Sequence, residues 1–419
     1  MLKPRHIGFV STRLSGTDGV SLEARKWVEV LEGDGHECFF FAGELDCPRD
    51  HEYVAPEAHF MHPVIKDVQA VLFGTSVRSP GVSQTVHEVS QRLKEHLYNF
   101  VRTYNLEALV VQNALAIPMN VPLGLALTEF ANETRMPIIA HHHDFYWERE
   151  RFLRTAVADY LRAAFPPTTP NLRHVTINSV AASELGLRAG VSSIVVPNVM
   201  NFTHMPQPGS GRVDVRRRFD IADSEIIVLQ PTRVVKRKRI ERAIECVHQL
   251  QRPAVLLVSH PAGDEGTGYL AWLRSYADRL GVRIACISDQ VALDVSAGNE
   301  RLTLQDLYAQ ADIVTYPSSH EGFGNAFIEA VYYKKPLLVN RYPIYRTDIA
   351  PKGFQVVEIE DVVTKETVDA IDHVLTDGTF RANMVEHNYA LGRRHYSYEV
   401  LRRHLRYLLS DLFGEDVSA

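Results

Sequence analysis

Two glutamates, Glu321 and Glu329, stand eight residues apart, on either side of a glycine-containing loop and the expected start of a helix. Gly322 and Gly324 allow the backbone to turn sharply and to approach a bound molecule closely. A helix that begins near Asn325 would direct amide groups and the positive end of its dipole at a phosphate. Both carboxylates could then accept hydrogen bonds from sugar hydroxyls. The alternative is an ordinary strand-to-helix connection with a solvated glutamate at each end.

A cluster of basic side chains follows an earlier expected strand. From Arg233 to Arg239, five of the seven residues are lysine or arginine. Arginine binds a diphosphate through paired hydrogen bonds, and lysine acts as a point charge. A basic run is also typical of a nuclear-localisation signal, a nucleic-acid patch or a solvated helix start. The chain has a formal net charge of −6, so it has no general attraction to nucleic acid, and we favour phosphate.

Three consecutive histidines and Asp144 end a strand expected in the first half of the chain. A histidine–aspartate pair can hydrogen-bond sugar hydroxyls or transfer protons. Three adjacent histidines cannot all point at one ion from a strand end, so we expect no metal site. Some of them can equally be packing residues, and the sequence leaves open whether His141, His142 or His143 faces a ligand.

Two further loops and a basic segment give weaker signals. The loop from Gly16 to Gly19 does not have the pattern G-x-G-x-x-G, so a dinucleotide cofactor is not expected. Residues 259–266 could border a base or phosphate pocket, or form an ordinary loop. Trp147, Arg149, Arg151 and Arg154 could favour a sugar or a small anionic acceptor, but we favour an amphipathic helix with a solvated basic face.

Short apolar runs that alternate with amphipathic stretches would position these motifs. This alternation predicts parallel βαβ units in two successive domains. The expected strands are residues 6–10, 38–42, 108–111, 138–140, 175–177, 194–196, 226–229, 255–258, 284–287, 313–316 and 337–339. Residues 197–212 are rich in proline and glycine and form the expected linker. Parallel sheets bind ligands beyond the carboxyl ends of their strands, where all the motifs above fall.

Cysteine content and hydropathy set further bounds. Four scattered cysteines, at positions 38, 47, 246 and 286, predict reduced thiols in a cytoplasmic protein. The most apolar long stretch, residues 108–130, is interrupted by polar residues and prolines, which argues against a membrane segment. The first apolar run, residues 7–10, is too short for a signal peptide.

Together these motifs resemble family 4 of the retaining glycosyltransferases, which have the GT-B architecture. Residues 321–329 match that family's E-x7-E motif, and Arg233 and Lys238 have the spacing of its diphosphate-binding arginine and lysine. His143 and Asp144 resemble its first-domain histidine–aspartate element. The residue after the family's lysine is usually glycine, but here it is Arg239.

The resemblance implies an α/β fold with two doubly wound, Rossmann-like domains that face each other across a cleft. Residues 1–200 would form the acceptor-side domain, residues 201–395 the nucleotide-sugar-binding domain, and residues 396–419 a helix that packs back on the first domain. The implied catalytic residues are His143, Asp144, Glu321, Arg233 and Lys238. The implied donor-binding residues are Gly16, Gly19, Arg233, Lys238, Glu321, Gly322, Phe323, Gly324, Asn325, Ala326 and Glu329.

The resemblance also implies the reaction. It predicts a retaining glycosyltransferase, without metal or cofactor, that moves glucose or mannose from a donor such as UDP-glucose or GDP-mannose. The acceptor would be a hydroxyl of a small molecule or glycan, and the enzyme could be a homo-oligomer. The alternatives are a sugar phosphorylase, a nucleotide-sugar epimerase, or a binding protein that has lost catalysis. A phosphorylase usually needs a pyridoxal lysine, and none can be identified.

Overall fold

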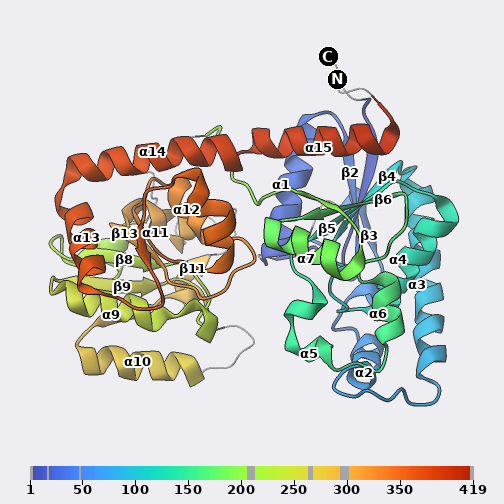
Figure 1. The fold of residues 1–419 in the computed structure, drawn as a ribbon, viewed down its shortest axis with the longest axis horizontal. Coiled ribbons are helices and arrows are strands. Elements are labelled where there is room, and N and C mark those ends of the chain that lie inside the picture. The colour runs from blue at the N-terminus through green and yellow to red at the C-terminus, as the bar shows by residue number, and fades with distance from the viewer. Residues whose placement is uncertain are drawn as a thin grey trace. The chain divides into compact units, whose positions relative to one another are not determined.

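The computed structural model describes residues 3–16, 18–46, 49–204, 213–262, 268–292 and 302–415. Sequence-based predictions that concern Thr17, Cys47, residues 205–212 and residues 263–266 lie outside this part of the chain. The chain divides into two units (Figure 1). Unit 1 comprises Met1–Val199 and Tyr398–Ala419, and unit 2 comprises Met200–Ser397.

Unit 1 contains a seven-stranded sheet in the order β3-β2-β1-β4-β5-β6-β7, in which every neighbouring pair is parallel. The strands are β1 (His6–Val10), β2 (Glu37–Ala42), β3 (Glu52–Val54), β4 (Ala108–Gln112), β5 (Ile138–His142), β6 (Leu172–Thr176) and β7 (Ser193–Val195). Strands β2 and β3 are added on one side of β1 and strands β4 to β7 on the other, so the strand order reverses between β1 and β4. A doubly wound sheet binds its ligands beyond the carboxyl ends of the strands at such a switch point.

Helices cover both faces of this sheet. They are α1 (Gly19–Gly33), α2 (Pro63–Leu72), α3 (Val82–Tyr104), α4 (Val121–Thr134), α5 (Glu150–Leu153), α6 (Ala158–Ala164), α7 (Ser179–Ala189) and α15 (Tyr398–Phe413). Leu109 of β4 joins the core beneath α3 and α4, whereas the next residue, Val110, joins the core beneath α1 and α15. Arg402 and Arg406 of α15 hold Asp34 at the end of α1, with Nε–Oδ distances of 3.0 and 2.8 Å. The C-terminal helix therefore packs on the first domain, as predicted.

Unit 2 contains a six-stranded parallel sheet in the order β10-β9-β8-β13-β14-β15, and its succession reverses between β8 and β13. The strands are β8 (Ile226–Gln230), β9 (Ala254–Val258), β10 (Arg283–Cys286), β13 (Ile313–Tyr316), β14 (Leu337–Asn340) and β15 (Val357–Ile359), with a separate pair, β11 (Val291–Ala292) and β12 (Leu302–Thr303). The helices are α8 (Val215–Arg218), α9 (Ile240–Leu250), α10 (Gly268–Leu280), α11 (Leu304–Gln310), α12 (Asn325–Tyr332), α13 (Lys365–Thr376) and α14 (Gly378–Tyr396).

The structure confirms the predicted α/β class with two doubly wound, parallel sheets. No helix in the described ranges is both long enough and apolar enough to cross a membrane. The described cysteines, Cys38, Cys246 and Cys286, are free thiols. Burial raises the pKa of the Cys246 thiol to about 12, so that thiol is unreactive at neutral pH.

Candidate active site

The loops that follow β8 and β13 meet at the switch point of unit 2. Lys238, in a short 3-10 helix after β8, is buried and forms an ion pair with the carboxylate of Glu321 after β13. Arg237 reaches the other carboxylate oxygen of Glu321 at 3.2 Å and the carbonyl of His320 at 3.1 Å. Two side chains assigned to the site from the sequence, Lys238 and Glu321, are therefore in direct contact.

The charges in this cluster are unevenly balanced. Burial alone would raise the pKa of Glu321, but the charges of Lys238 and Arg237 outweigh it and lower the pKa, so the carboxylate is ionised. Desolvation lowers the pKa of Lys238, and Glu321 opposes that effect. Arg233 is exposed and makes no ion pair with any carboxylate in the described ranges. The cluster therefore offers more positive than negative charge, which suits an anionic ligand.

His260, just after the neighbouring strand β9, is influenced by the positive charges of the loop after β8. Desolvation, followed by the charges of Lys238 and Arg233, lowers the pKa of His260 to about 4. Its Nδ1 lies 2.9 Å from the hydroxyl oxygen of Ser259. His260 is thus a neutral imidazole at pH 7 beside a positively charged loop.

The glycine loop before α12 has a conformation that requires glycine. Gly324 has a φ of +136°, and a Cβ atom added there would lie 2.5 Å from the hydroxyl oxygen of Tyr342. That hydroxyl donates a hydrogen bond of 2.8 Å to the carbonyl of Phe323. Helix α12 begins at Asn325, which confirms the predicted helix start. Its first turn, with Asn325 and Ala326, provides the positive end of a helix dipole.

Glu329 lies inside α12 and is held by a residue that the sequence did not reveal. Its carboxylate accepts a hydrogen bond of 2.8 Å from the hydroxyl of Tyr308 on α11. Tyr308 is fully buried. A tyrosine shortly before strand β13 is only a weak signal in the sequence. The packing of α11 is needed to show that its hydroxyl contacts the Glu329 carboxylate.

Removal of that hydroxyl, in Tyr308→Phe, is expected to raise the KM for the sugar donor about two- to tenfold with little change in kcat. A typical hydrogen bond contributes about 0.5–1.5 kcal/mol, and Glu329 would lose the group that orients it. Tyr333→Phe is the matched control, because it removes the hydroxyl from the ring that stacks on Tyr308, with ring centroids 4.9 Å apart. Steady-state kinetics with varied donor checks this, and an unchanged KM in Tyr308→Phe would contradict it.

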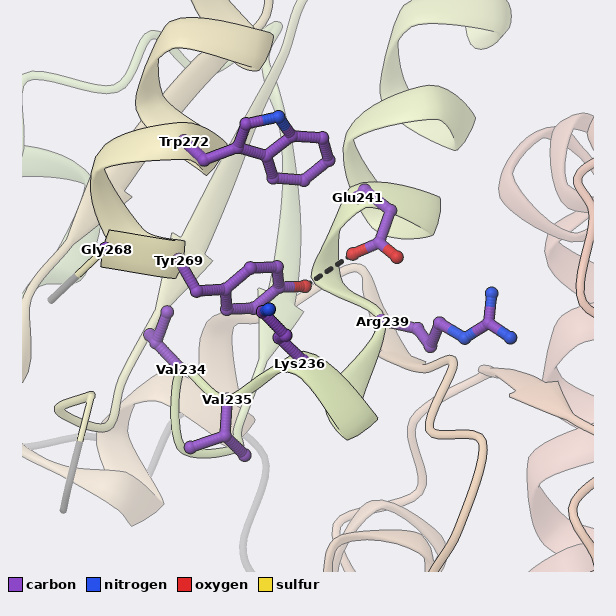
Figure 2. Close-up of a pocket in the computed structure, with 8 residues that line it drawn as sticks. All are labelled: Val234, Val235, Lys236, Arg239, Glu241, Gly268, Tyr269 and Trp272. Atoms are coloured by element: carbon purple, nitrogen blue, oxygen red, sulfur yellow. Dashed lines mark hydrogen bonds between the residues drawn. The ribbon is translucent and has the colours of Figure 1, made fainter. Parts of the chain in front are cut away.

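The remaining basic residues of the loop face a different environment. Lys236 and Arg239 line a cavity of about 710 Å³ beside α9 and α10. Figure 2 shows the rings of Tyr269 and Trp272 along this cavity, with the Tyr269 hydroxyl bonded to the carboxylate of Glu241. Arg237, but not Lys236, therefore joins Lys238 in its contact with Glu321.

Arg239 occupies the position where the resembled family usually has glycine. Its φ is +51°, in the left-handed region that glycine adopts without strain. The loop thus keeps a backbone conformation that favours glycine, although its side chain is an arginine.

In unit 1 the three histidines have different surroundings. His141 is buried against Trp27, with ring centroids 4.2 Å apart, and its Nδ1 lies 2.9 Å from Oε1 of Gln112. His142 is buried, and its Nε2 lies 2.9 Å from Nδ1 of His174. His143 alone is half-buried. Two of the three are therefore packing residues, and His143 is the one with access to solvent.

His143 and Asp144 are oriented by polar residues at the end of β4. Desolvation lowers the pKa of His143 to about 4, although the charges of Asp144 and Asp18 oppose it. The amide of His143 donates to Oδ1 of Asn113 at 3.0 Å, and Nδ2 of Asn113 donates to Asp144 at 2.9 Å. Gln112 and Asn113 directly follow an apolar run in the sequence. Polar residues at the end of an expected strand could have indicated that these two belong to the site.

The first glycine loop is fixed by two aspartates. Gly16 has a φ of +70°, and its amide donates to Asp46 at 2.7 Å. Gly19 is the first residue of α1, and Asp18 caps that helix by accepting hydrogen bonds from the amides of Val20 and Ser21. The structure places this loop in unit 1, whereas the other donor-binding residues predicted from the sequence, residues 233–329, lie in unit 2.

The segment after the histidines contains a shorter helix than expected. We favoured an amphipathic helix with a solvated basic face, but α5 is only four residues long, Glu150–Leu153. Arg149 precedes it and forms an ion pair with Asp144. Arg149 and Arg151 both line a pocket of unit 1. Arg149 and Arg151 are both exposed, in keeping with a solvated basic face, whereas the expected helix is confined to the four residues of α5.

The free energy of unfolding is expected to decrease as the pH falls from about 6.5 towards 4. His143, His174 and His260 have pKa values lowered to about 4, mainly by desolvation. Unfolded histidines titrate near 6.5, so between these values the unfolded chain binds more protons and is favoured. Urea denaturation at pH 7, 6 and 5 measures this. His260→Gln should reduce the dependence and the exposed His204→Gln should not, whereas a flat profile would contradict the expectation.

Comparison with known proteins identifies the family. Residues 212–391 match the family described as Glycosyl transferases group 1. A mannosylglucosylglycerate synthase from Thermotoga maritima is 32% identical over 420 residues, which span 92% of this chain and 95% of that protein. The chain belongs to the group 1 glycosyltransferases. This glycosyltransferase is also 31% identical over 380 residues to a mannosylglucosylglycerate synthase from Petrotoga mobilis, across 84% of this chain and 86% of that protein.

Solved structures share the fold. The Anabaena protein HepE, in complex with UDP-glucose, superposes with a TM-score of 0.65 at 14% identity, over 97% of this chain and 100% of that chain. This likeness establishes the GT-B fold. A glycosyltransferase of this family uses a nucleotide-sugar donor and an acceptor, so both substrates need sites in this chain.

Proposed function

We propose that this glycosyltransferase moves a mannosyl group from a nucleoside-diphosphate mannose to a hydroxyl of glucosylglycerate. Both relatives that align over most of the chain are mannosylglucosylglycerate synthases, and that name describes a product built from mannose, glucose and glycerate. Mannose is one of the two hexoses that the family resemblance implies. The acceptor of such a reaction is a small, negatively charged sugar acid.

The contact between Lys238 and Glu321 at the switch point of unit 2 carries the assignment of the donor site. It joins a cation suited to a diphosphate with a carboxylate suited to sugar hydroxyls, at the sheet edge where doubly wound folds bind ligands. In the proposed complex, Arg233, Lys238 and the first turn of α12 bind the diphosphate. Glu329 binds the ribose, and Glu321 binds the donor sugar.

The proposed chemistry is electrostatic. Cleavage of the bond between the anomeric carbon and the diphosphate oxygen leaves negative charge on the departing nucleoside diphosphate. The acceptor oxygen forms the new bond to the anomeric carbon, and the proton of its hydroxyl passes to the departing phosphate oxygen. Lys238, held by Glu321, and Arg233 would place positive charge where that negative charge develops, and preorganised charge of this kind stabilises a transition state. His143, neutral at pH 7, would hydrogen-bond the donor sugar. We propose that the anomeric configuration is retained and that no metal takes part.

Transfer assays test this proposal directly. The enzyme is incubated with glucosylglycerate and either GDP-mannose or UDP-glucose, with and without EDTA, and with Glu329→Ala as the control variant. We expect a mannosylated product from GDP-mannose in both conditions, with its anomeric configuration retained by NMR, and a strong loss in Glu329→Ala. Preferential transfer of glucose, or phosphate-dependent release of a hexose 1-phosphate, would show that the assignment is wrong.

A further inference from the structure

A pocket of about 220 Å³ lies in unit 1 at the switch point between β1 and β4. Its walls come from the segments that follow β1, β4 and β5 and from Phe60, after β3, so it sits at the carboxyl edge of the sheet. Doubly wound sheets bind their ligands at this place. The residues proposed above for the diphosphate and the ribose belong to unit 2, whereas this pocket lies wholly in unit 1, next to His143, which contacts Gln112 of its lining.

Three arginines line the pocket, and one of them lacks a partner of opposite charge. Arg13 forms an ion pair with Asp18 at 3.0 Å, and Arg149 pairs with Asp144. Within the part of the chain that is described, no carboxylate pairs with Arg151. Its guanidinium instead contacts the sulfur of Met119 at 2.7 Å and lies 4.5 Å from the centre of the Phe152 ring. The pocket therefore carries an uncompensated positive charge.

A buried amide on the same pocket is also unsatisfied. Gln112 is fully buried, and its Oε1 lies 2.9 Å from Nδ1 of His141 and 3.1 Å from Nε2 of His143. Its Nε2 has no hydrogen-bond partner among the described residues. Buried polar groups in native proteins are nearly always satisfied, by protein, water or ligand. An oxygen of a bound molecule would supply the missing acceptor.

We infer that this pocket binds the carboxylate end of the acceptor, with Arg151 as the residue that recognises its charge and Gln112 as a hydrogen-bond donor. The inference rests on the proposed function, because the glycerate unit provides the carboxylate. Arginine suits a carboxylate through paired hydrogen bonds. The apolar side chains of Met119 and Phe60, on the same walls, leave room for the carbon skeleton.

A comparison of charged and neutral acceptors tests the pocket. We use glucosylglycerate and its neutral analogue glucosylglycerol with the wild type, Arg151→Gln and Arg154→Gln. Arg154 is an exposed arginine of the same segment that does not line the pocket, which makes it the matched control. Arg151→Gln is expected to lower kcat/KM for glucosylglycerate about ten- to a hundredfold, as for the loss of a hydrogen bond to a charged group. It should change the value for glucosylglycerol less than about threefold, with an unchanged donor KM.

Calorimetric binding of glucosylglycerate separates this inference from the proposed function. If the wild type binds it through Arg151 but transfers no mannose, the pocket stands and the proposed function falls. If mannosyl transfer occurs and Arg151→Gln behaves like Arg154→Gln, the pocket assignment falls alone. Equal losses on both acceptors would also overturn it, because they would indicate a structural role. Absence of both binding and transfer would overturn both.

Discussion

Lys238→Ala is expected to lower kcat/KM for mannosyl transfer about a hundredfold. A hydrogen bond to a charged group contributes about 1.5–3 kcal/mol, and about 1.4 kcal/mol corresponds to a factor of ten. The loss of Lys238 has a second effect, because Glu321 would remain buried with only the more distant Arg237 beside it. A carboxylate balanced only by Arg237 would repel the diphosphate that the cluster is proposed to bind. We therefore expect a loss of transition-state stabilisation near the upper end of the range of about 1.5–3 kcal/mol.

Three variants separate the loss of charge from the loss of folding. Removal of one partner of a buried ion pair typically destabilises a protein by roughly 3–5 kcal/mol, so urea denaturation must show that Lys238→Ala is folded at the assay temperature. Lys238→Arg keeps the charge and should retain more activity. Lys365→Ala, at an exposed lysine paired with Asp369 on a helix surface, should behave like the wild type. Turnover by Lys238→Ala within about twofold of the wild type would refute the diphosphate assignment.

The regular elements nearest the site were the most predictable from the sequence. Strand β13 was predicted at 313–316 and is observed at Ile313–Tyr316. Strands buried on both faces of a parallel sheet are largely apolar runs, and this one is bounded in the sequence by Asp312 and Pro317. Helix α9, Ile240–Leu250, is marked in the sequence by apolar residues that recur at helical spacing before Gln251.

Short edge strands could not be predicted in the same way. Strand β3, Glu52–Val54, and strand β15, Val357–Ile359, each have three residues, and each alternates charged with apolar or aromatic residues. Such a segment is too short for its periodicity to be distinguished from a loop. Pairing with β2 and β14 selects the extended conformation, and that selection depends on the finished sheet.

The same limit applies to the site. The sequence placed Lys238 and Glu321 at separate strand ends, and their contact follows from the pairing of β8 with β13. It also left the three histidines equivalent, because burial against Trp27 and His174 is a tertiary property. The partners of Glu329 and Gln112 were missed for the same reason. Sequence patterns therefore indicate which segments carry the site residues. Tertiary packing determines which of their side chains are buried and which are accessible to a ligand.

Gly324→Ala is expected to destabilise unit 2 and to raise the donor KM about tenfold or more. At a φ of +136° an alanine is strained, and backbone strain of this kind costs roughly 1–3 kcal/mol. The new Cβ would also lie 2.5 Å from the hydroxyl oxygen of Tyr342, which is held by its bond to Phe323. To relieve the contact, the loop that carries Glu321 and the start of α12 must shift. The proposed phosphate and sugar contacts would be lost together.

A second substitution distinguishes the two causes. Tyr342→Phe removes the hydroxyl that the alanine meets, so in the double variant the steric contact is relieved while the strain at φ +136° remains. We expect Gly324→Ala/Tyr342→Phe to recover part of the unfolding free energy lost in Gly324→Ala, and Gly378→Ala, where a Cβ meets no atom within 4 Å, to cost little. Donor binding, measured by calorimetry with GDP-mannose, should recover only if the loop returns to its original position. Recovery of stability without binding would show that the donor site requires the backbone conformation of Gly324 itself, whereas wild-type binding in Gly324→Ala alone would mean that this loop does not contact the donor.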